Sequence, residues 1–108
     1  MKTEAVINKL SLKLLAGDIP EEFDGVYAGD FLSRAMSRVS EGDLWVTIMN
    51  NVNVIAVASL ADAAAVILAE GVTMDKATLD AASSKGVTVF TCDSTVYEIC
   101  RDIASVVS

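Results

Sequence analysis

The segment from Leu44 to Ala61 carries no charged side chain, and it constrains the fold more than any other part of the sequence. Thr47 and three asparagines interrupt it, so it does not predict a membrane-spanning helix. Its first part, residues 44–49 (LWVTIM), is β-rich and places apolar residues on both faces, which is typical of a strand covered by helices on each side. We therefore expect a central strand in an α/β protein.

The rest of the chain predicts alternating helices and strands. The predicted helices lie at the start of residues 3–18, from Asp30 to about Ser40, at 52–61, within 72–86 and within 94–108. The predicted strands lie at residues 12–17, briefly at Val26 and Tyr27, at 44–49, at 63–71 and at 87–93. This order predicts a small parallel, possibly mixed, sheet with helices on both faces.

Three residues are expected to mark the ends of helices. Asp30 is the expected amino-terminal cap of the helix that runs to about Ser40, and Thr73 is the expected cap of the helix within 72–86. Gly86 is expected to terminate that second helix.

Composition bounds the function. The chain of 108 residues predicts one domain, 1–108, and its net charge of −7 with eight basic residues argues against nucleic acid and membrane partners. Histidine is absent, so the usual general base and most zinc sites are missing. The spacing of Cys92 and Cys100 fits neither a zinc knuckle nor a redox pair, and we expect two reduced thiols. The sequence thus predicts a cytoplasmic protein that is not an enzyme and has no metal or cofactor.

A family resemblance covers roughly residues 3 to 104. Its most informative parts are Gly29-Asp30 ahead of a helix, the strand and asparagine turn leading into VAVASLADAAAVIL-like text, and GVTVFTCDSTVYEI. Over these parts the chain resembles the DRTGG domain family, which is related to the amino-terminal domain of HPr kinase/phosphorylase. The resemblance implies a small α/β regulatory domain that pairs with itself and acts on a separate partner enzyme. The Asp-Arg-Thr-Gly-Gly string itself is absent from this sequence.

The candidate ligand-binding residues follow predicted strands. The asparagines Asn50, Asn51 and Asn53 offer amide donors and acceptors to a polar or anionic ligand, although asparagine also serves as a turn and cap residue. Gly29 and Asp30 form either a turn with a cap or the rim of a ligand site. The expected ligand is an adenine nucleotide or a small phosphate.

Ser94 and Thr95 also follow a predicted strand, and they are either a helix cap or an anion contact. They could also be phosphate acceptors, which gives the alternative of a phosphorylatable switch of the anti-sigma-factor-antagonist type. Arg34 and Arg38 lie one helical turn apart and form the one arginine pair able to clamp an anion, the alternative being ordinary solvated surface residues. Finally, we expect a homodimer whose interface uses apolar residues between Met49 and Leu60.

Overall fold

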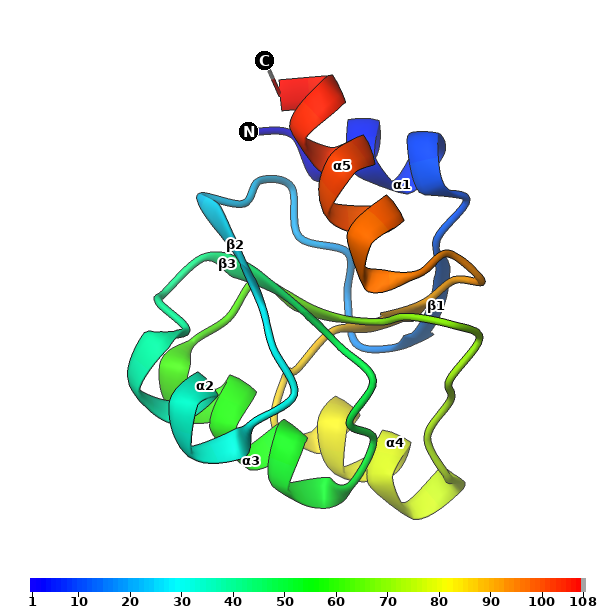
Figure 1. Cartoon of the computed structure of the whole chain (residues 1–108). Coiled ribbons are helices and arrows are strands. Elements are labelled where there is room, and N and C mark those ends of the chain that lie inside the picture. Colours follow the sequence, from blue (N-terminus) through cyan, green and yellow to red (C-terminus); the bar gives the residue numbers. More distant parts are fainter. Residues whose placement is uncertain (108) are drawn as a thin grey trace.

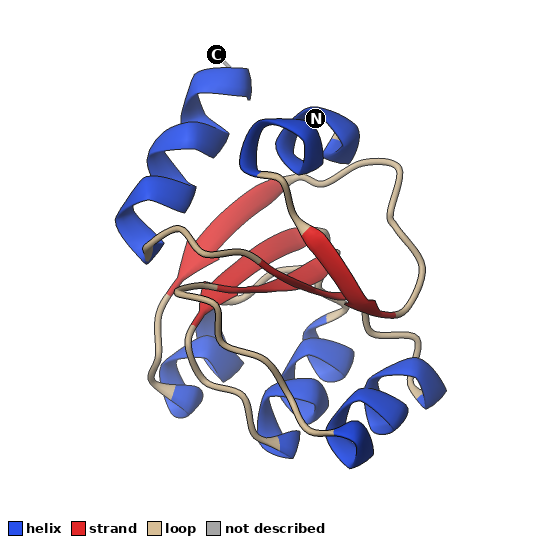
Figure 2. Ribbon diagram, turned by 90° about the vertical axis from the view of Figure 1, so that its right-hand side faces the viewer, coloured by secondary structure: helices blue, strands red, loops and turns tan. Residues whose placement is uncertain are grey.

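A mixed five-stranded sheet lies between two layers of helices (Figure 1, Figure 2). The structure is a computed structural model, and it describes residues 1–107. The elements in chain order are α1 (Thr3–Leu10), β1 (Lys13–Ala16), β2 (Gly25–Ala28), α2 (Leu32–Arg38), β3 (Asp43–Thr47), α3 (Val52–Ala61), β4 (Ala65–Leu68), α4 (Lys76–Ser84), β5 (Val89–Thr91) and α5 (Val96–Val107). The α/β class and the helices on both faces, which the sequence predicts, are confirmed.

The strand order is β1-β5-β4-β3-β2. Strands β2 to β5 are parallel to one another, and β1 pairs antiparallel with β5. Helices α2, α3 and α4 cover one face, while α1 and α5 lie side by side on the other (Figure 1). The chain therefore crosses to the opposite face of the sheet after β5. The neighbouring parallel strands β4 and β5 are followed by helices on different faces, α4 and α5 respectively.

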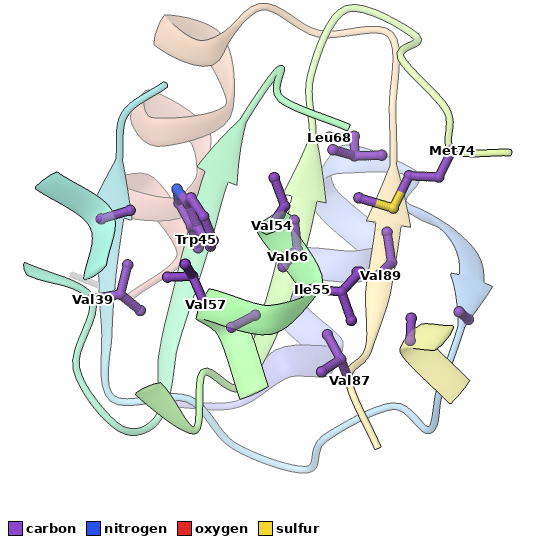
Figure 3. Packing of buried hydrophobic residues seen from close by; sticks show 14 residues of the cluster. Val39, Trp45, Val54, Ile55, Val57, Val66, Leu68, Met74, Val87 and Val89 are labelled. Atoms are coloured by element: carbon purple, nitrogen blue, oxygen red, sulfur yellow. The ribbon is translucent and has the colours of Figure 1, made fainter. Parts of the chain in front are cut away.

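Strand β3 lies inside the sheet, between the edge strand β2 and the middle strand β4, and its side chains alternate between two cores. Trp45 is fully buried with Val66 of β4 and with Val54 and Val57 of α3, as Figure 3 shows. Leu44 and other side chains of the opposite face pack beneath α1 and α5. Helices therefore cover both faces of this strand, as the apolar residues on its two faces predict.

Helix α3 spans Val52–Ala61, as predicted, but its apolar side chains are used differently from the expectation. Val54, Ile55, Val57 and Ala58 are buried in the protein's own core. These four residues belong to the Met49–Leu60 segment in which the sequence predicts a dimer interface, and they are covered within the chain because α3 lies between α2 and α4 and against the sheet. Leu60 is the most exposed of the remainder, at 82%.

Two predicted helix caps are wrong. Helix α2 runs from Leu32 to Arg38, and the residue at its cap position is Phe31, which makes no side-chain cap hydrogen bond. Asp30 therefore lies one residue before the cap position. Helix α4 is capped by Asp75, whose carboxylate accepts a hydrogen bond from the Thr78 N–H at 2.8 Å, and not by Thr73. A cap oxygen must reach the N–H two or three residues ahead, and Thr73 lies too early in the chain to do so.

Gly86 follows the end of α4 with a left-handed φ of +69°, which agrees with its predicted role as a terminator. Within residues 1–107, none of the helices is long and apolar enough to cross a membrane.

Candidate functional site

The carboxyl ends of β2, β3, β4 and β5 lie along one edge of the sheet because these strands are parallel. The first residue of the antiparallel β1 joins them, since Lys13 is paired with Thr91 at the end of β5. All the loops that carry the predicted site residues therefore start from this carboxyl edge. Ligands of open α/β sheets usually bind at such an edge.

Asp30 connects the loop after β2 to the end of β3. Its Oδ1 accepts hydrogen bonds from the Thr47 hydroxyl at 2.7 Å and from the Ile48 N–H at 2.8 Å. The Thr47 oxygen in turn accepts a hydrogen bond from the Met49 N–H at 3.1 Å. Gly29 is held beside this link by its carbonyl, which accepts a hydrogen bond from the Trp45 indole at 3.1 Å. Asp30 thus orders two neighbouring loops of the edge.

The three asparagines have three different environments. Asn51 caps α3, and its side-chain oxygen accepts a hydrogen bond from the Asn53 N–H at 2.9 Å. The Asn50 amide donates to the Thr73 carbonyl at 2.8 Å and so joins the loop after β3 to the loop after β4. The side chain of Asn53 is exposed and makes no hydrogen bond within the described part of the chain. Two of the three amides are therefore engaged in holding the loops.

The loops after β4 and β5 lead to helices on opposite faces, which is the arrangement that opens a ligand crevice in many α/β proteins. Here they are joined by backbone hydrogen bonds, from the Glu70 N–H to the Ser94 carbonyl at 2.9 Å and from the Gly71 N–H to the Cys92 carbonyl at 2.8 Å. A β-carbon at Gly71 would lie 3.1 Å from the Asp93 carboxylate. The crevice is closed at this point.

Thr95 forms a capping box at the start of α5. Its hydroxyl accepts a hydrogen bond from the Glu98 N–H at 3.2 Å, and the Glu98 carboxylate accepts one from the Thr95 N–H at 2.9 Å. These hydrogen bonds to Thr95 lower the pKa of Glu98 from its ordinary value. The cap interpretation of Thr95 is thus confirmed, while the neighbouring Ser94 is half-buried and lines a depression.

That depression, of about 250 Å³, lies where the end of β5 meets the start of β1. It is lined by Leu10, Ser11, Lys13, Thr91, Cys92, Asp93 and Ser94. Burial raises the pKa of the Cys92 thiol, which therefore stays protonated at neutral pH. The formal charges of the lining are the Lys13 ammonium and the Asp93 carboxylate. Lys13 is in none of the ion pairs of residues 1–107.

The sequence reasoning missed Ser11, Lys13 and Asp93. Asp93 could have been found, because it precedes Ser94 directly after a predicted strand. Ser11 and Lys13 come from the antiparallel β1, whose pairing with β5 joins residues far apart in the chain. Hydrophobic periodicity does not encode that pairing.

The other predicted anion contact, Arg34 and Arg38, is exposed on α2 and does not line the depression. The described part of the chain has no group of three or more His, Cys, Asp or Glu side chains that could hold a metal ion. Both cysteines are free, with Cys92 buried and Cys100 half-buried.

The fold and its carboxyl edge define a small α/β domain with a polar depression at the end of a parallel strand. The chain belongs to the DRTGG domain family, whose model matches residues 6–106. A search of curated proteins finds no match.

A solved structure is similar to this chain with a TM-score of 0.75 and 18% sequence identity. It contains the CBS and DRTGG domains of the regulatory region of Clostridium perfringens pyrophosphatase, complexed with its activator, diadenosine tetraphosphate. The match covers 94% of this chain and 45% of the other chain, so this chain spans less than half the length of that relative. At this identity the likeness shows the fold.

Proposed function

We propose that this chain is a regulatory domain that binds an adenine nucleotide at the carboxyl edge of its sheet and acts, without turnover, on a separate partner enzyme. The observation that carries the proposal is the depression at the end of β5, whose lining includes Lys13, Ser11, Ser94 and Asp93; within residues 1–107 Lys13 is in no ion pair. Support comes from the family and from the similar regulatory region, whose activator, diadenosine tetraphosphate, contains adenosine and phosphate.

The chemistry of the depression suits the phosphate and ribose of a nucleotide. The Lys13 ammonium and the serine hydroxyls are able to donate to phosphate oxygens, and the Asp93 carboxylate accepts hydrogen bonds from ribose hydroxyls. The volume of about 250 Å³ is below the roughly 300 Å³ at which typical small-molecule sites begin, so part of the ligand extends over the loops. The part of the ligand outside the depression would lie over the neighbouring loops of the carboxyl edge. These loops contain the other predicted residues: Gly29, Asp30, Asn50, Asn51, the exposed Asn53 and Thr95.

Charge selects among nucleotides. One lysine lines the depression, whereas the net charge of the whole chain is −7. A triphosphate therefore meets more repulsion than a monophosphate, and we expect AMP or inorganic phosphate to bind more tightly than metal-free ATP.

The proposal includes a cytoplasmic location and a homodimer as the acting form. Two free cysteines fit a reducing compartment. Catalysis is assigned to the partner enzyme in this proposal. The depression has a protonated thiol, three hydroxyl groups, one lysine and one carboxylate, and its lining has no histidine to act as the usual general base.

Isothermal titration calorimetry with AMP, ATP and inorganic phosphate tests the ligand. We expect Lys13→Gln to weaken AMP binding at least tenfold, because the only facing cation is lost. The matched control is Lys85→Gln, since Lys85 follows α4 at the opposite edge of the sheet. The absence of binding by the unmodified protein, or equal weakening by both variants, would refute the proposed site.

A further inference from the structure

Helix α2 is the one helix within residues 1–107 whose side chains carry a net positive charge. Helices α1 and α4 each have one acidic and one basic side chain, α3 has no charged side chain, and α5 has two acidic and one basic. Helix α2, with the sequence LSRAMSR, has Arg34 and Arg38 and no acidic residue. In a chain of net charge −7, it is therefore a local basic surface on an acidic protein.

The stability of the helix does not account for the position of Arg34. It is the third residue of α2 and lies in the first turn, where the helix dipole favours an acidic side chain, whereas Arg38 lies in the last turn, where the dipole favours a cation. Both side chains are exposed, and neither is in an ion pair within residues 1–107. Both guanidinium groups are therefore available to a partner.

An exposed aromatic side chain continues the line of the two arginines. Phe31, Arg34 and Arg38 are separated by three and four residues, so they follow one flank of the helix. We call these three residues the basic stripe. The side chain of Phe31 is 66% exposed, whereas those of Phe23 and Phe90 are 1% exposed. The stripe thus combines one apolar side chain with two cations.

The amino-terminal end of the basic stripe is fixed to the sheet. The Phe31 carbonyl accepts hydrogen bonds from the Arg34 and Ala35 N–H groups, both at 3.0 Å, and the preceding Asp30 is hydrogen-bonded to the end of β3. Helix α2 lies at the end of its layer, with α3 between it and α4 (Figure 1). A side chain whose backbone is already ordered loses less entropy when it binds a partner.

The carboxylates nearest to the stripe in the sequence do not neutralise it. Asp30 accepts hydrogen bonds from groups of β3 and the loop after it, and the Asp43 carboxylate accepts one from the Ser40 N–H at 2.8 Å. Glu41 follows Arg38 by three residues and forms no ion pair within residues 1–107. The two arginines are thus without a carboxylate partner in their own chain.

We propose that the basic stripe binds an acidic helical segment of the partner enzyme, with two carboxylates on Arg34 and Arg38 and an apolar side chain on Phe31. Guanidinium groups bind carboxylates through two parallel hydrogen bonds. Two acidic residues one turn apart on a helix have the same spacing as the two arginines, about 5 to 6 Å between β-carbons. The inference rests on the separate partner enzyme of the proposed function and assigns the surface that binds it.

The net charge of the chain favours a protein over nucleic acid as the occupant. A phosphate polymer extends well beyond two arginines and meets the acidic remainder of the surface, whereas a short acidic segment contacts the stripe alone. Phe31 adds an apolar contact that a partner helix is able to match.

Titration of the isotopically labelled full chain with a designed peptide, followed by two-dimensional ¹H–¹⁵N NMR, tests the assignment. The probe is an alanine-based helical peptide with two glutamates one turn apart and a leucine one turn beyond them. At low salt we expect saturable shifts at the amide signals of residues 31–38, with an affinity that falls as sodium chloride is added. The matched peptide with lysines in place of the glutamates should cause no shifts.

The variants separate the stripe from the overall charge. The double variant Arg34→Gln with Arg38→Gln should weaken binding of the acidic peptide at least tenfold, and it should fold because both side chains are exposed and without an ion pair. The matched control is Lys9→Gln with Lys85→Gln, which removes the same charge from two other exposed positions and should bind like the unmodified protein.

Three results would overturn the inference: no shifts at millimolar acidic peptide, equal binding of the lysine peptide, or equal weakening by the two double variants. A DNA oligonucleotide that shifts residues 31–38 while the acidic peptide does not would also overturn it. Calorimetry with AMP on the arginine variant separates this failure from that of the proposed ligand site, because neither arginine lines the depression. A protein that binds AMP but not the acidic peptide refutes the basic stripe and leaves the ligand site intact.

Discussion

Replacing Thr47 with valine should destabilise the protein by about 2 to 3 kcal/mol, although the two side chains have nearly the same shape. The side chain is fully buried, and its hydroxyl donates to Asp30 at 2.7 Å and accepts from the Met49 N–H at 3.1 Å. A hydrogen bond to a charged group contributes about 1.5 to 3 kcal/mol, and the lost bond to Met49 adds about 1 kcal/mol. The extra methyl group recovers part of this by apolar burial.

The free energy of unfolding is measured by urea denaturation, followed by the fluorescence of the single Trp45, which is itself fully buried. With an m-value of roughly 1 to 3 kcal/mol per molar urea, the midpoint should fall by about 0.7 to 3 M. The control is Thr73→Val, because Thr73 is exposed and does not cap α4; its effect should stay within about 0.5 kcal/mol. A Thr47→Val protein as stable as the unmodified one would refute the role assigned to the link between Asp30 and the end of β3.

Further predictions concern the caps and the thiols. Asn51→Ala should lower the free energy of unfolding by about 1 kcal/mol, whereas Asn53→Ala should leave it unchanged in the same urea assay, because only Asn51 caps α3. Hydrogen bonds from Thr78 and from Thr95 hold the pKa of Asp75 and of Glu98, respectively, below the ordinary values of these carboxyl groups in the folded state. Each carboxylate therefore stabilises the folded state at pH values above its ordinary pKa, and this stabilisation is lost as the pH falls through the lower pKa of the folded state. In thermal melts between pH 6 and pH 2, the melting temperature of Glu98→Gln should fall less than that of the unmodified protein. Burial raises the pKa of the Cys92 thiol, so iodoacetamide at pH 7.5 should alkylate it more slowly than it alkylates glutathione, as read by intact mass; equal rates would contradict its burial.

The sequence was sufficient to predict the elements whose signal is local. Residues 52–61 form a helix, as predicted. The prediction follows because two buried strands cannot succeed each other along the chain without a turn between them. The strand at the start of the uncharged segment is an interior strand next to the middle one, and its apolar residues are buried on both faces. These properties depend on neighbouring residues and are visible in the amino-acid order.

The details of the candidate site depend on contacts between distant residues, and these were predicted less well. Asp30 has the residue type and position of a cap, but its carboxylate binds Thr47 and Ile48, which a tertiary contact brings within reach. Lys13 joins the depression through the antiparallel pairing of β1 with β5. The composition of a segment does not specify which strand it will pair with, so the sequence predicted the edge of the sheet on which the depression lies but only part of the lining of that depression.

A titration of the isotopically labelled protein with AMP, followed by two-dimensional ¹H–¹⁵N NMR, tests the central claim most directly. The account predicts saturable shifts that are largest at the amide signals of residues 11–13 and 91–95, and it predicts that Lys13→Gln abolishes them at the same AMP concentration. Saturable shifts confined to residues away from the carboxyl edge, or no shifts at millimolar AMP, would contradict it.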